Sequence, residues 1–237
     1  MLSSPRFSAL RTFGVSSIVV TSVLLAACNS TTESAPDSRI PTTIVVNAGV
    51  DGQTANVGAA LPTLASVTVR DQDGQLLPGA VVLWAVRSGG GTVGLTSTTT
   101  DTLGKATTSW VMGRTAGTQI LLAAISAVDT IRITATARAL SPTTFELIDG
   151  DNQELLAGTI SAPFQVRAQD MYLNPVPNEP VRWQASAGTL TSDTTLTNSA
   201  GIASVQLTAP ATVSTVAITA RLANGSSLSF QARVRPQ

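Results

Sequence analysis

The residues of this chain that could do chemistry are few, because reactive nitrogen and sulfur side chains are almost absent. The 237 residues include no histidine and one cysteine, Cys28. A Ser-His or Cys-His pair for nucleophilic catalysis cannot be assembled, and neither can a zinc site of histidine and cysteine ligands. The single lysine, Lys105, follows a turn glycine and is the only base for a Ser-Lys arrangement.

Clustered carboxylates are the remaining candidates. One group is Asp71 with Asp73, and the other is Asp149 with Asp151 and Glu154. Facing carboxyl groups could perform glycosidase-type acid-base chemistry, and clustered carboxylate oxygens could bind calcium. Both groups lie next to glycine or asparagine, where β-turns select aspartate for its hydrogen bonds to the backbone. We therefore interpret them as turn residues and predict no catalytic site, metal site, cofactor or enzymatic activity.

The composition argues against two further functions. Lysine and arginine total 14, as do aspartate and glutamate, so no basic patch is available to neutralise phosphates, and nucleic acid is excluded as a partner. A sugar-binding platform needs exposed aromatic rings. Tyr172 is the one aromatic residue after Cys28 that we expect in a loop, because the others are predicted to face inward: Trp84, Trp110, Phe145, Phe164, Trp183 and Phe230.

The N-terminal residues 1–27 are typical of a targeting segment. Arg6 and Arg11 give a positive start, and the apolar stretch 15–27 is short for a membrane span. That stretch ends in a four-residue sequence, Leu25-Ala26-Ala27-Cys28, which resembles the lipobox of bacterial lipoproteins. The resemblance implies that 1–27 is a cleaved signal peptide and that Cys28 becomes the acylated first residue of the mature chain.

A lipidated Cys28 would anchor the chain in a membrane of the cell envelope, because multiple acyl chains make a stable anchor. Asn29, rather than aspartate, follows the cysteine, which the resemblance makes compatible with the outer membrane in bacteria that have two membranes. Residues 28–39 are polar and aperiodic and predict a flexible tether, with a reach of roughly 40 Å when fully extended.

The rest of the chain repeats itself. The segment 78–84 recurs at 177–183, with Trp183 lying 99 residues after Trp84, and Gly188 lies 97 residues after Gly91. This period predicts two domains, at 40–138 (the first module) and 139–237 (the second module), each large enough to bury its own core. The glycine-rich stretch after Trp84 is interpreted as a loop, because the second copy is two residues shorter there.

Short segments of alternating polarity predict strands. In the first module they are 43–46, 66–70, 80–86, 92–95, 105–111, 119–125 and 130–137. Val67, Val69 and Ile133 are expected on inward faces, as are Phe164, Val166 and Phe230 in the second module. Asn224-Gly225 predicts a type I′ hairpin turn. The fold class is therefore all-β, with two tandem immunoglobulin-like β-sandwiches after a signal peptide and a tether.

The order of turn and core residues resembles the bacterial Ig-like group 1 modules of intimin- and invasin-type surface proteins. In the first module the matching residues are Asp71, Gly74, Pro78-Gly79, Val82, Trp84, Gly91-Thr92, Asp101, Gly104, Ala106 and the segment 115–118. The second module departs in its loops, with Leu173 in place of Gly74, Asn178 in place of Gly79 and 211–215 in place of 115–118. The resemblance implies a module type and carries over no receptor.

These features predict a non-enzymatic envelope lipoprotein whose modules act as a spacer or a protein-interaction and adhesion module. The alternative is a ligand-binding accessory subunit, for polysaccharide, of an envelope complex. Partners are then the membrane, through Cys28, and a protein on the cell surface. Between the modules, 138–143 contains Pro142 and predicts a limited hinge. Val81, Leu83 and Ala85 form a second apolar face beside Trp84, which we expect to be covered by a loop, the other module or a partner.

Overall fold

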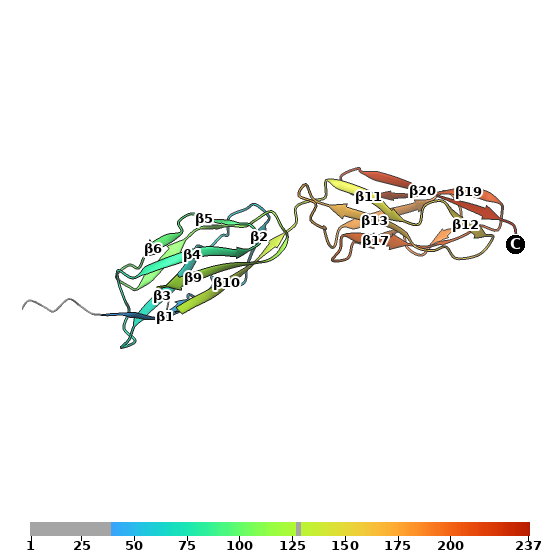
Figure 1. The fold of residues 1–237 in the computed structure, drawn as a ribbon. Helices are drawn as coiled ribbons and strands as arrows, with labels where there is room; N and C mark the ends of the chain where they lie inside the picture. The colour runs from blue at the N-terminus through green and yellow to red at the C-terminus, as the bar shows by residue number, and fades with distance from the viewer. Residues whose placement is uncertain (1–38, 127–128) are drawn as a thin grey trace, which may run out of the picture. The chain divides into compact units, whose positions relative to one another are not determined.

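The computed structural model describes residues 39–126 and 129–237, so Cys28, the segment 1–27 and most of the predicted tether lie outside the described residues. All regular structure in the described part is β-strand (Figure 1). Each module combines a three-stranded and a five-stranded sheet around a core of its own. The prediction of an all-β chain of tandem Ig-like sandwiches is confirmed. Within these ranges no helix is long and apolar enough to cross a membrane.

The first module has its sheets in the orders β1-β3-β7 and β2-β10-β9-β4-β6, with a small β5-β8 pair. The bounds are β1 (Pro41–Val46), β2 (Gln53–Asn56), β3 (Ala65–Asp71), β4 (Val81–Ser88), β5 (Thr92–Val93), β6 (Ser97–Thr99), β7 (Lys105–Thr108), β8 (Trp110–Val111), β9 (Gly117–Ile125) and β10 (Asp129–Arg138).

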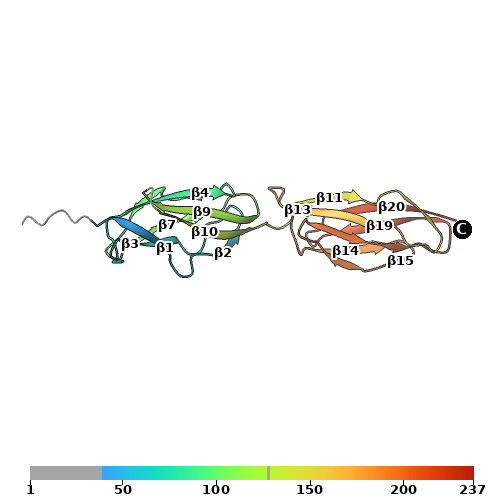
Figure 2. The ribbon, with the colours of Figure 1, turned by 60° about the horizontal axis from the view of Figure 1, so that its bottom comes forward.

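The second module repeats this topology strand for strand, as β11-β13-β17 and β12-β20-β19-β14-β16 with a β15-β18 pair (Figure 2). The bounds are β11 (Thr144–Asp149), β12 (Gln153–Leu156), β13 (Phe164–Gln169), β14 (Pro180–Ala185), β15 (Thr189–Leu190), β16 (Thr194–Leu196), β17 (Ile202–Val205), β18 (Leu207–Thr208), β19 (Ser214–Arg221) and β20 (Ser227–Arg235). Because the topologies match, each module serves as a structural control for the other.

Three strand predictions need correction. The predicted strand 105–111 is broken at Ser109, and its halves β7 and β8 join different sheets. At the break the hydroxyl of Thr108 donates to the carbonyl of Leu95 and accepts from its amide, which ties the chain to the loop before β6. The short strands β2 and β6 were not predicted, because they are polar and become strands only by pairing with β10 and β4.

The repeated tryptophan is a core residue in both modules. Trp84 is 3% exposed and Trp183 is 4% exposed. Each indole Nε1–H donates to a threonine hydroxyl on the neighbouring strand at 2.8 Å, Trp84 to Thr98 and Trp183 to Thr195. A buried donor without an acceptor lowers the stability of the fold. The threonine of β6 or β16 therefore stabilises the buried tryptophan by supplying that acceptor. The inward alternation of β3, β13 and β20 is also confirmed.

The turn after β19 differs from the prediction. Gly225 has a positive φ of 93°, whereas Asn224 is not among the residues with positive φ. Gly225 N donates to the Leu222 carbonyl at 3.1 Å, and Leu222 N donates to the Ser226 carbonyl at 2.9 Å. This is a type I turn followed by a glycine bulge, which needs one left-handed residue where a type I′ turn needs two.

The cover expected over the second apolar face is not supplied by the described chain. Val81 is 53% exposed and Leu83 is 51% exposed, and Ala85 is exposed as well. Their partners across the sheet on β9 are Ala124 and Leu122, which are half-buried. The prediction that a loop or the other module covers this face is wrong.

We expect Thr195→Val to lower the free energy of unfolding by about 1 to 3 kcal/mol, because it leaves the Trp183 Nε1–H buried without an acceptor. Urea unfolding followed by tryptophan fluorescence measures the change. Thr194→Val, an exposed neighbour on the same strand, is the control. Equal stability of the two variants would contradict the assignment.

Candidate interaction site

Of the five carboxylates that the sequence singled out, Asp71, Asp149 and Asp151 accept backbone amides, and Glu154 pairs with Arg235. Asp71 Oδ1 accepts the amides of Asp73 and Gln75 at 3.0 and 2.8 Å. Asp149 accepts the amide of Gly150, and Asp151 accepts the amide of Gln231. Within residues 39–126 and 129–237 no group of three acidic, histidine or cysteine side chains is placed to hold a metal ion. These aspartates therefore shape the backbone, as the sequence suggested.

A different set of polar residues comes together where the second module meets the first. Asp170, at the end of β13, is fully buried. Its Oδ1 accepts the amides of Tyr172 and Asn174 at 2.8 and 2.9 Å, and its Oδ2 accepts the amide of Leu140 at 3.1 Å and the side-chain Nδ2 of Asn174 at 3.0 Å. Burial by itself raises the pKa of Asp170, but these hydrogen bonds outweigh it and the net shift is downward. The carboxylate is thus charged and fixed.

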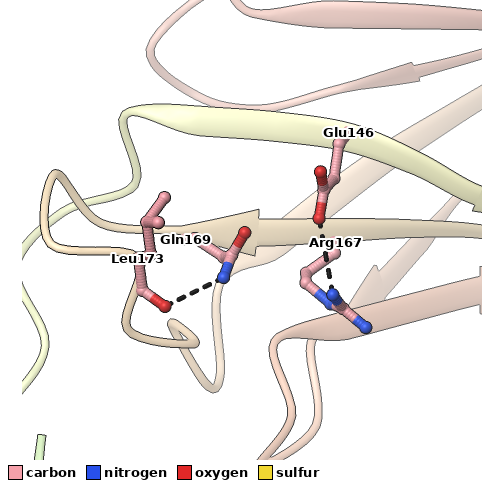
Figure 3. Close-up of polar contacts among 4 residues, drawn as sticks. All are labelled: Glu146, Arg167, Gln169 and Leu173. Carbon is pink, nitrogen blue, oxygen red and sulfur yellow. Dashed lines mark hydrogen bonds and ion pairs between the residues drawn. The ribbon is translucent and has the colours of Figure 1, made fainter.

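The turn that Asp170 organises contains a residue in an unfavourable conformation. Leu173 has a φ of +64°, close to the +74° of Gly74 in the first module, and Asn178 has +60° against +75° for Gly79. At these two positions the departures from the group 1 pattern therefore keep the left-handed backbone. A leucine in the left-handed region costs about 1 to 2 kcal/mol. Gln169 Nε2 donates to the Leu173 carbonyl at 2.9 Å and helps to hold it, beside the half-buried Glu146–Arg167 pair that joins β11 and β13 (Figure 3).

Asn174 connects this turn to the first module with both ends of its amide. Its Nδ2 donates to the carbonyl of Arg114 at 2.8 Å, and its Oδ1 accepts the amide of Ala116 at 2.8 Å. Asn174 is only 7% exposed. Ala116 belongs to the segment 115–118 that carries the group 1 resemblance. That segment therefore provides the first module's side of the junction.

Tyr172 adds a second contact across the junction. The guanidinium carbon of Arg114 lies 5.2 Å from the centre of its ring. The ring is half-buried and packs against the first module's core, so the residue predicted to stand alone in a loop is covered by the neighbouring module. A cation over an aromatic ring adds about 0.5 to 1 kcal/mol at a partly exposed site.

The segment 138–143, predicted to be a limited hinge, is hydrogen-bonded on both sides. The carbonyl of Arg138 accepts the amide of Val57 in the first module. In the second module the amides of Leu140 and Thr143 are bound by Asp170 and Gln169, and Asn224 Nδ2 donates to the carbonyl of Pro142 at 3.0 Å. These bonds restrict the linker beyond what the proline alone would do.

The glycine-rich stretch after Trp84 positions the Arg114 loop. A Cβ on Gly89 would lie 2.3 Å from the side chain of Gln119, and one on Gly113 would lie 1.6 Å from the Gly89 carbonyl. Gln119, only 1% exposed, holds the loop by accepting the amide of Gly113 and donating to the carbonyl of Thr115, both at 2.8 Å. The glycine-rich stretch is a loop, as predicted, but Gly89 and Gly113 have no room for a side chain in the first module.

A groove of about 610 Å³ runs along the junction. Its walls include Ala116 and Arg138 from the first module and Ala139, Val176, Pro177 and Asn178 from the second. Pro177 and Asn178 begin the second copy of the repeated segment, so the repeat contributes to an interface as well as to the core.

Comparison with known proteins agrees with this architecture. Residues 145–234 match the family model of the bacterial Ig-like domain (group 1), which confirms the resemblance for the second module. No curated protein matches the chain.

Solved structures that match this chain include InvD of Yersinia pseudotuberculosis, at 16% identity and a TM-score of 0.55, covering 82% of this chain and 57% of that one. The Escherichia coli adhesin FdeC matches at 17% identity, covering 84% and 66%, with a TM-score of 0.45. The D0-D1 domains of intimin match at 19% identity, covering 82% and 97%, with a TM-score of 0.34. The likeness to InvD supports a shared fold.

We expect Asn174→Ala to lower the free energy of unfolding by about 1 to 3 kcal/mol, because it removes two junction hydrogen bonds and a donor to the buried Asp170. Gln75→Ala, at the equivalent exposed position of the first module, should change it by less than about 0.5 kcal/mol. Chemical denaturation of both variants makes the comparison. Equal effects of the two changes would show that the Asn174 contacts contribute nothing specific.

Proposed function

We propose that this chain, whose second module is a bacterial Ig-like domain of group 1, is a membrane-anchored lipoprotein of the cell envelope. Its two modules act as a spacer or a protein-interaction module in adhesion. The observation that supports this most is the bonded junction. Asn174 and Tyr172 of the second module contact the first module directly. The two modules are therefore joined by side-chain contacts as well as by the linker.

The anchor part of the proposal depends on Cys28 and the apolar sequence before it. A thiol is the nucleophile that lipidation needs, and Cys28 is the chain's only thiol. Between Cys28 and Arg39 the tether could extend roughly 40 Å, which would present the modules away from the bilayer. The outer membrane is the proposed address in a bacterium with two membranes.

The interaction part depends on the module type and on which side chains are exposed. Within the described ranges every aromatic side chain is buried or half-buried, and the loop tyrosine is covered by Arg114. A polysaccharide-binding face needs exposed rings, so the protein-interaction function is favoured over the accessory-subunit alternative. The carboxylates engaged in turns likewise give no support to an enzyme.

The anchor is tested by Cys28→Ser in the full chain, with Ser30→Ala as the matched control. We expect the serine variant to move from the membrane fraction to the soluble fraction and to lose incorporation of labelled fatty acid, because no thiol remains to be acylated. Fractionation and labelling of cells measure both effects. Retention of the serine variant in the membrane without acyl label would refute the lipoprotein assignment.

The interaction function is tested by crosslinking on intact cells followed by identification of the linked species. A protein partner that is recovered with the full chain supports the proposal. Recovery of envelope polysaccharide alone would favour the accessory-subunit alternative.

A further inference from the structure

The turn 170–174, which bonds one end of the first module, has a counterpart at the other end of that module. Asp71 accepts the amides of Asp73 and Gln75 through Oδ1, just as Asp170 accepts those of Tyr172 and Asn174. The left-handed residue recurs as Gly74, whose carbonyl accepts from Arg70 Nη1 at 2.8 Å. The N-terminal tip of the first module, defined as residues 71–79 with Ile40 and Leu103, therefore has the backbone of a docking turn.

This tip lacks the contacts that complete the internal junction. Asp71 is 2% exposed, yet its Oδ2 has no hydrogen-bond partner. The corresponding Oδ2 of Asp170 accepts from Leu140 and from the amide of Asn174. Gln75, which occupies the place of Asn174, is exposed instead of buried. A buried carboxylate oxygen without a donor is rare. Asp170 receives its Oδ2 donors from its own module, so what the first module lacks is an amide side chain that turns toward Asp71 as Asn174 turns toward Asp170.

The wall beside the turn is also repeated and is open in the first module. Val176, Pro177 and Asn178 line the junction groove, and their counterparts Leu77, Pro78 and Gly79 line a hollow of about 390 Å³. Elsewhere in the tip, outside the lining of this hollow, the apolar side chains of three residues are exposed: Ile40 by 59%, Leu76 by 36% and Leu103 by 64%. The second module has Pro175 and Ala200 in place of the two leucines. The N-terminal tip therefore carries two leucines that the docked tip lacks, while the exposed apolar residues of the docked turn are Met171 and Leu173.

A loop that aligns with the one bonded by Asn174 lies at the far end of the second module. The loop 210–214 is the counterpart of 113–117, the loop that Asn174 grips, with Ala211 in place of Arg114 and Val213 in place of Ala116. Val213 is 66% exposed. The larger apolar residue on this side matches the larger apolar residues on the N-terminal tip. Asp73 occupies the position of Tyr172, and Ala211 occupies that of Arg114. The two surfaces therefore lack both members of the cation-over-ring pair.

We propose that the N-terminal tip of the first module binds the loop 210–214 of a second copy of this chain, head to tail. The Gln75 amide bonds the Ala211 carbonyl and the Val213 amide, as Asn174 bonds Arg114 and Ala116. Val213 packs against Leu76 and Ile40. Such a contact joins two different surfaces and can propagate from copy to copy. This inference extends the proposed interaction function and names a partner for it.

The test uses two differently tagged copies of the full chain in the same cells, one with Asp73→Cys and the other with Ala211→Cys. Both positions are exposed, and their counterparts Tyr172 and Arg114 are in side-chain contact. The control pairs Asp73→Cys with Asp193→Cys, an exposed position far from the loop in sequence. We expect about tenfold more disulfide-linked mixed dimer than in the control, because docking raises the effective concentration of the two thiols.

Adding Gln75→Ala to the Asp73→Cys copy should reduce the dimer to the control yield, whereas Gln75→Asn, which installs the amide used at the internal junction, should retain it. A yield equal to that of the control, or one that is insensitive to Gln75→Ala, overturns the proposal. If the Asp73→Cys chain forms its disulfide with a different protein, the proposal that the partner is a second copy of this chain is wrong. None of these outcomes bears on membrane anchoring, which the Cys28→Ser fractionation tests separately.

Discussion

The buried carboxylate of Asp170 is the constraint on which the junction between the modules depends. A charged group without solvent is tolerated only when its oxygens receive hydrogen bonds, and Asp170 receives them from the amides of Tyr172, Asn174 and Leu140 and from the Asn174 side chain. These bonds fix the turn, its left-handed Leu173 and the start of the second module. The Asn174 amide and the Tyr172 ring, which contact the first module, are both positioned by this one carboxylate.

The same turn has different consequences in the two modules. In the first module Gly74 occupies the left-handed position without strain, and the neighbouring Gln75 is exposed. In the second module a leucine occupies it at a cost of about 1 to 2 kcal/mol. Backbone strain persists only where the surroundings over-determine it, and here they include the contacts to the first module. The docked turn thus carries a strained leucine where the open turn has an unstrained glycine.

The sequence was sufficient to predict the core of each sandwich. Alternation in β3, β13 and β20 and the recurrence of Trp84 at Trp183 are local or periodic signals, and each was confirmed. The strands β2 and β6 could not be predicted in this way, because their polar residues form strands only through partners distant in sequence.

The junction was missed for a similar reason. Asn174 lies 58 and 60 residues from the groups it bonds, and in the sequence it is simply a turn asparagine. One signal was available in Leu173, a bulky residue at a position where the first module has glycine. Violations of a local rule of this kind mark functional or strained sites.

Amide hydrogen exchange at Ala116 tests the junction most directly, because the acceptor of that amide is the Asn174 side chain of the other module. We predict that Ala116 is protected in the native chain, that Asn174→Ala removes the protection, and that Gln75→Ala leaves it unchanged. Exchange of Ala116 at the same rate in the native chain and in Asn174→Ala would contradict the account, because the two modules would then be joined by the linker alone.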